Sequence, residues 1–257
     1  MSGDSNPFKA PVARVRDHSE FVIGDFLPDG RRVPAGNGYQ WLARGWEMFR
    51  SAPGPWICIA VAFMGSMMLV SLIPIVNVVA NLLIPVFIGG IGIGCRAIEE
   101  GEGIRFEHLF AGFSRPLGGL LLVGLLYLLA LLALIALFGI VVAVGAVGAI
   151  GSAGAGGAIS LMVIASGLLM VLVFVPLAMA VWLAPPLVVF HEMSAFQAVR
   201  ASFVVSLRNF TPFLVYGLLV LLASVVASLP LLLGWLVLLP VLHASLYACY
   251  RDLFFAP

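Results

Sequence analysis

The chain has 257 residues, of which 62% are hydrophobic and 10% charged, and its formal net charge at pH 7 is +1. An average soluble domain carries about 25% charged residues, so this composition indicates a membrane protein. The small net charge excludes a nucleic-acid-binding protein that relies on overall basicity, because phosphate contacts require a concentrated cationic surface.

Residues 1–36 are predicted to form an extended cytoplasmic arm. They contain four prolines and charges of alternating sign but no apolar run of signal-peptide length, so we expect the segment to be retained. Near its end, Arg31 and Arg32 are expected to contact anionic headgroups, at about 1 kcal/mol for each charge.

Three long stretches without Asp, Glu, Lys or Arg predict an all-α polytopic membrane protein. They span 51–95, 116–191 and 209–250, which are 45, 76 and 42 residues long, whereas about 20 apolar residues cross a bilayer as a helix. A charged residue at the centre of such a helix costs about 2.5–3.5 kcal/mol. Residues 37–257 therefore form a predicted six-span domain, with spans near 55–74, 78–95, 117–138, 159–184, 211–229 and 232–250.

The middle stretch contains a glycine-rich insert at 139–160, with glycine at every third position from 145 to 157. We favour a flexible or re-entrant connection, because each glycine costs a helix nearly 1 kcal/mol relative to alanine. The alternative is a helical extension of the third or fourth span, packed closely through its small residues.

The distribution of basic residues predicts the orientation. All thirteen Lys and Arg fall in the N-terminal region, the loops at 96–115 and 190–209, or the C-terminus, and the three opposite connections carry none. Short-loop Lys and Arg mark the cytoplasmic side, so both termini are expected in the cytoplasm.

A unit of similar design precedes each pair of predicted spans. Segments 40–50, 104–113 and 194–208 are amphipathic at helical spacing, and each is followed by a short polar step and a proline. We interpret them as interfacial helices that begin three parallel hairpins. The candidate contacts with lipid or a partner protein are Arg31, Arg32, Trp41, Trp46, Phe49 and Arg50.

The sequence shows no catalytic or metal-binding constellation. The spans contain no Asp or Glu, HExxH does not occur, and no metal-ligand spacing is present. His243 is the only histidine inside a span, and we expect a hydrogen bond to a neighbouring helix rather than haem ligation. GGIGIGC (89–95) is expected to allow close helix packing. No cofactor is predicted.

Several stretches resemble an uncharacterised family of proteobacterial six-span inner-membrane proteins. They are NPFKAPVARV (6–15), GRRVPAGNGYQWLARGWEMFRSAPGPW (30–56), GCRAIEEGE (94–102) and HLFAGF (108–113). Residues 184–213 are more distantly similar to the membrane domain attached to some glycerophosphodiester phosphodiesterases, whose catalytic domain has no counterpart in this chain. The resemblance implies a multi-pass protein of the bacterial inner membrane and no activity.

Three functions remain open at this stage. The favoured one is a non-catalytic scaffold, accessory or assembly factor that contacts lipids, another inner-membrane protein or a second copy of itself. The alternative is a transporter or lipid-handling protein for apolar or amphipathic small molecules, with a polar path formed by Asn77, Asn81, Tyr216 and His243. An enzyme with cytoplasmic chemistry at Glu192, His191 or His108 is the least favoured.

Overall fold

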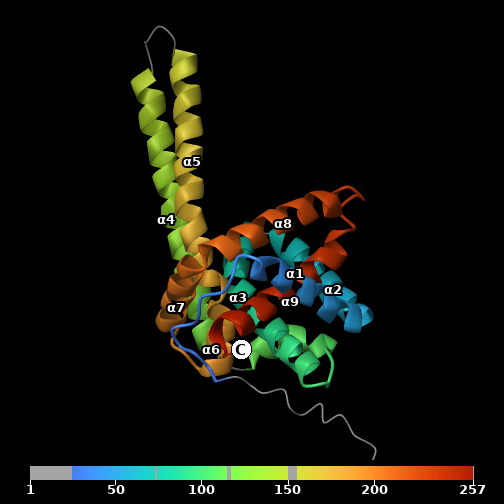
Figure 1. Cartoon of the computed structure of the whole chain (residues 1–257). Helices are drawn as coiled ribbons and strands as arrows, with labels where there is room; N and C mark the ends of the chain where they lie inside the picture. The colour runs from blue at the N-terminus through green and yellow to red at the C-terminus, as the bar shows by residue number, and fades with distance from the viewer. Residues whose placement is uncertain (1–24, 73, 115–116, 150–154, 257) are drawn as a thin grey trace, which may run out of the picture.

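The computed structural model describes residues 25–72, 74–114, 117–149 and 155–256, and these are almost entirely helical (Figure 1). In this described part, the one pairing of extended segments is an isolated antiparallel bridge between Phe26 and Phe255. The helices are α1 (Asn37–Ser51), α2 (Pro53–Ser71), α3 (Pro74–Glu99), the 3-10 helix η1 (Phe106–Phe113), α4 (Leu117–Ala149), α5 (Ala155–Trp182), α6 (Ala184–His191), α7 (Ala195–Arg208), α8 (Phe210–Ser228) and α9 (Trp235–Phe254).

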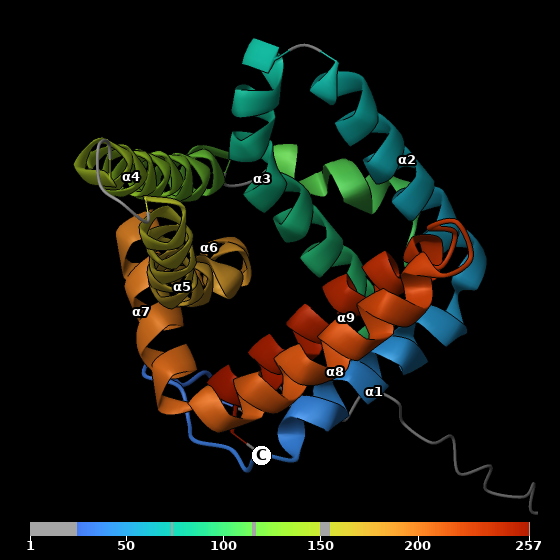
Figure 2. The ribbon, with the colours of Figure 1, turned by 90° about the horizontal axis from the view of Figure 1, so that it is seen from above.

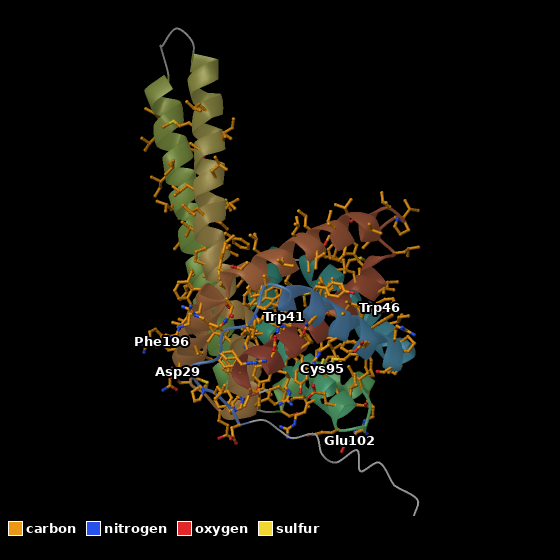
Figure 3. The ribbon with its side chains drawn as sticks, in the orientation of Figure 1. Asp29, Trp41, Trp46, Cys95, Glu102 and Phe196 are labelled. Atoms are coloured by element: carbon orange, nitrogen blue, oxygen red, sulfur yellow. The ribbon has the colours of Figure 1, made fainter. Side chains whose placement is uncertain are left out.

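Helices α4 and α5 form a long antiparallel hairpin that rises out of a body made by the other helices (Figure 1). Seen from above, the hairpin is viewed nearly along its length, and α2, α3, α8 and α9 lie to one side of it, with α2 farthest away (Figure 2). The large apolar side chains of the hairpin project outward along much of its length (Figure 3). Such a surface is suited to lipid, because hydrocarbon accepts apolar side chains that water would not.

Four described helical segments are long and apolar enough to cross a membrane: Asn81–Glu99, Leu117–Val144, Leu161–His191 and Phe210–Ser228. A fifth is obtained if α1 and Pro53–Leu69 of α2, which meet at 104°, count as one broken span. The six predicted spans and their hairpin arrangement are therefore not confirmed. Residue 73, within the predicted span 55–74, lies outside the described residues.

The predicted sixth span, 232–250, corresponds to α9, which is not among the candidate spans. Its last turn carries Arg251 and Asp252, and every residue from Ala244 to Tyr250 is buried. α9 packs against α1, α2, α3 and α8 and so forms the centre of the body. A helix buried on nearly all sides needs apolar residues for packing, whether or not it crosses a membrane.

The favoured interpretation of 139–160 as a loop or re-entrant segment is wrong for the described residues. α4 continues to Ala149 and α5 begins at Ala155, so most of the glycine-rich insert is helical, and 150–154 lies outside the described residues. The cost of glycine is outweighed because backbone groups in an apolar environment must bond within the helix.

The three amphipathic segments are largely helical, although in 104–113 the helix is of the 3-10 type and begins only at Phe106. α7 begins with a capping box in which the backbone N–H of Gln197 donates to Ser194 Oγ. α1 lies flat on α8 and α9, because Gly38 and Gly45 bring its backbone against theirs. Their placement at a membrane interface is not tested by these contacts.

The close packing expected of GGIGIGC is confirmed. A methyl group at Gly90 would lie 2.5 Å from the carbonyl oxygen of His108, and one at Gly94 would lie 2.9 Å from the side chain of Ile104. Small residues here let α3 and η1 pack backbone to backbone.

Candidate functional site

A cavity of about 380 Å³ lies between α3, α4, α5 and α9. Its walls are mostly apolar, and its volume falls in the range of small-molecule sites, which is roughly 300–1,000 Å³. The lining residues are Asn81, Ile84, Pro85, Ile88, Tyr127, Phe174, Ala178, Val181, Trp182, Leu239, Leu242, His243 and Leu246. All of these lining residues fall within the three charge-free stretches of the sequence.

Polar groups from all four helices face or border this apolar space. His243 Nδ1 bonds to the carbonyl oxygen of Leu239, one turn earlier on the same helix, at 2.8 Å. The hydrogen bond to a neighbouring helix expected for His243 is thus wrong: α9 itself supplies the acceptor. The hydroxyl of Tyr127 has no hydrogen-bond partner among the described residues.

Trp182 forms a wall of the cavity near the end of α5. Its indole Nε1 is buried and has no hydrogen-bond partner among the described residues. A buried donor left unpaired costs about 1–3 kcal/mol, so such groups are rare in folded proteins. Because the nitrogen itself is buried, a molecule in the cavity would reach it only after the indole ring shifted, and the unpaired donor is a local cost of this packing.

A second hollow of about 520 Å³, almost wholly apolar, lies between α5 and α8. Phe174, Ala178 and Trp182 line both hollows, and their spacing of four residues places them on one face of α5. Tyr216 lines this second hollow, but its hydroxyl bonds to Ser245 Oγ at 2.6 Å and is already satisfied. The two hollows therefore share one wall but differ in polarity.

No charged residue lines either hollow. Within the described part of the chain, no group of three or more His, Cys, Asp or Glu is close enough to hold a metal ion. The chemistry that the cavity offers is neutral hydrogen bonding inside an apolar enclosure.

The predicted polar path is thus divided. Asn81 and His243 line the same cavity and Tyr216 lines the neighbouring hollow, whereas the side chain of Asn77 lies outside the described residues. Tyr127 and Trp182 were not predicted to line a site, although the sequence carries a signal for both. They are the only Tyr and the only Trp in the charge-free stretch 116–191.

The predicted contact residues lie elsewhere, around the carboxylate of Asp252. Oδ1 accepts from Arg31 Nη2, and Oδ2 accepts from Asn37 Nδ2 and Trp41 Nε1, both at 2.7 Å. Trp41 is only 1% exposed, so its ring faces the interior rather than a partner. We call Arg31, Asn37, Trp41 and Asp252 the Asp252 cluster.

Segment 25–36, predicted as part of an extended arm, is fastened to the helices by this cluster and by backbone bonds. Leu27 N donates to the carbonyl of Phe254, and Arg31 N to that of Leu253, each at 2.8 Å. Asn209 extends the attachment: its Oδ1 accepts from Val33 N, and its Nδ2 donates to the carbonyl of Arg31.

The remaining predicted contact residues divide by exposure. Phe49 is buried, whereas Arg32, Trp46 and Arg50 are exposed. Trp46 lies on the outer face of α1 and is 45% exposed (Figure 3). An exposed surface for lipid or a partner thus remains on α1, but without Trp41 and Phe49.

Comparison with known proteins gives one informative match. The chain is 29% identical to a probable inner membrane protein of Burkholderia thailandensis, over a 253-residue alignment that covers 86% of this chain and 92% of the relative. No known family profile matches the chain. No solved structure matches it either. The distant likeness to the membrane domain of glycerophosphodiester phosphodiesterases has no support in these comparisons.

Proposed function

We propose that this chain is an integral inner-membrane protein that binds an amphipathic small molecule between its helices and handles it without chemical change. The similarity to a probable inner membrane protein and the long apolar helices support the location. The sequence alone favours a scaffold over a lipid-handling role, whereas the cavity between the helices supports the lipid-handling role.

The observation that carries this proposal is the cavity between α3, α4, α5 and α9. It is large enough for part of a lipid, and it is lined by Tyr127 of α4 and His243 of α9, whose hydroxyl and Nε2 have no hydrogen-bond partner among the described residues. A helix bundle whose only task is mechanical gains stability by filling such a space, because interiors are close-packed and unpaired polar groups are costly. A binding site retains both features for its ligand.

Ala178→Phe tests the proposal, because Ala178 lines both hollows and a phenyl ring there would occupy their shared wall. The matched control is Ala165→Phe, on an exposed position of the same helix. Native mass spectrometry of the full chain in mild detergent should show a lipid at fixed stoichiometry for the wild type and for A165F, and its loss in A178F. Equal lipid retention by both variants would contradict the proposal.

A non-catalytic scaffold or accessory role is the second candidate, favoured by the outer face of α1. Tyr39, Arg44, Trp46 and Arg50 are all exposed there, and aromatic and Arg side chains are typical of binding hot spots. The partner would be another inner-membrane protein or a second copy of the chain. Trp46→Ala with Arg50→Ala should abolish co-purification at fixed stoichiometry, and an unchanged complex would exclude this face.

The orientation, with both termini in the cytoplasm, remains part of the proposal. It depends on the absence of Lys and Arg from the three opposite connections. Reporter fusions at each end should be active only when the reporter is one that works in the cytoplasm. Activity of a periplasmic reporter at either end would refute this orientation.

A further inference from the structure

The polar groups of the cavity between α3, α4, α5 and α9 restrict the chemistry of its ligand. Resting on the proposed function, we infer that the ligand is an uncharged lipid with a hydroxyl group, held by His243 and Tyr127 with its hydrocarbon chain along α5.

His243 requires a hydrogen-bond donor from the ligand. Its Nδ1 lies 2.8 Å from the carbonyl oxygen of Leu239, and a carbonyl oxygen only accepts, so Nδ1 carries the ring proton. In a neutral imidazole the other nitrogen, Nε2, is then an acceptor. The structure gives Nε2 no partner among the described residues, and His243 lines the cavity while its ring also packs edge-on against Phe63 of α2.

Tyr127 favours an acceptor on the same ligand. Tyr127 lines the cavity, and its hydroxyl, which can donate, has no partner among the described residues. A ketone or an ester accepts but cannot donate to His243. A hydroxyl group both donates and accepts, so it satisfies both requirements.

The absence of charge from the cavity wall excludes an ionic headgroup. Neither Lys nor Arg lines the cavity to neutralise a phosphate or carboxylate, and neither Asp nor Glu lines it to neutralise an amine. An ion buried without a counter-charge loses far more hydration energy than neutral hydrogen bonds return.

The hydrocarbon part of the ligand fits the second hollow, between α5 and α8. This hollow shares Phe174, Ala178 and Trp182 with the cavity, and almost all of its exposed surface is apolar. A lipid that passes along these three shared residues would leave its hydroxyl group in the polar cavity and place its hydrocarbon chain in the apolar second hollow.

Three photoactivatable probes of equal chain length test the inference on the full-length protein: a fatty alcohol, its methyl ether and the corresponding fatty acid. The ether keeps the acceptor oxygen but cannot donate. We expect the wild type to bind the alcohol about fivefold to tenfold more tightly than the ether, since one hydrogen bond to an otherwise unpaired acceptor is lost. The ionised fatty acid should bind more weakly than the alcohol.

Variants of His243 separate recognition from packing. His243→Gln keeps an acceptor and should keep the preference for the alcohol, whereas His243→Leu should remove it. His108→Leu, on η1 outside the cavity, is the control and should behave like the wild type. Equal binding of alcohol and ether, or tighter binding of the fatty acid, would overturn the inference while the proposed function stands. If none of the three probes binds while the wild type still retains a lipid in native mass spectrometry, the inference fails and the proposed function stands.

Discussion

Replacing Asp252 by Asn tests whether the Asp252 cluster attaches segment 25–36 to the helices. One carboxylate accepts from Arg31, Asn37 and Trp41. An amide offers a single acceptor oxygen, and its NH₂ group would face one or more of these three donors. At least one of the three partners therefore loses its acceptor. The ion pair with Arg31 is lost as well. Hydrogen bonds to a charged group contribute about 1.5–3 kcal/mol each, and the 30% exposed Arg31 side chain reduces its share.

We therefore expect Asp252→Asn to lower the free energy of unfolding by about 2–4 kcal/mol. For a chain of this size, that corresponds to a fall in Tm of roughly 4–16 °C. Glu100→Gln is the control, because Glu100 and Arg96 form a surface pair in which both side chains are 48% exposed. Such pairs contribute less than about 1 kcal/mol.

The assay is thermal unfolding in one mild detergent, with trypsin cleavage after Arg31 as a local readout. The wild type should resist cleavage there, because backbone bonds to α9 hold the segment, and D252N should be cut faster. If D252N and E100Q have the same Tm and the same cleavage rate, the cluster does not attach the segment, and the reasoning is refuted.

Three further predictions follow from packing, titration and exposure. Gly112→Ala would place a methyl group against the α3 backbone and should lower the free energy of unfolding by about 1–3 kcal/mol. Gly118→Ala, whose methyl group would meet open space, should not lower it. Denaturant unfolding of both variants measures the difference. Burial, and then Arg105, lower the pKa of His108 below 6.5, so its contribution to stability is complete above pH 6.5 and declines as the pH falls; a His108→Gln variant should show a shallower decline in Tm. In the folded protein a maleimide should label the exposed Cys58 and spare the two buried cysteines until denaturant is added.

The sequence predicted the helical class well, because charge exclusion and apolar length are strong signals for membrane helices. The amphipathic segments were also identified as helices, and the small residues of α3 were correctly assigned to packing. The glycine-rich insert was misjudged because intrinsic propensity was measured in water, where a helix competes with hydrated backbone.

The candidate site was predicted only in part. Asn81 and His243 could be chosen because polar residues stand out in apolar spans. Tyr127 and Trp182 look like lipid-facing aromatics until tertiary packing brings them to the same cavity. The role of Asp252 could not be foreseen, since its partners lie more than 200 positions away and only the fold brings them together.

Mapping where a photoactivatable fatty alcohol crosslinks to the full-length protein, in membranes of a bacterial host, tests the central claim most directly. The account predicts that crosslinked peptides concentrate on residues 174–182 of α5 and 239–246 of α9, and that Ala178→Phe removes them while Ala165→Phe does not. Crosslinks spread evenly over the outer faces of α4 and α5, and unchanged by Ala178→Phe, would contradict it.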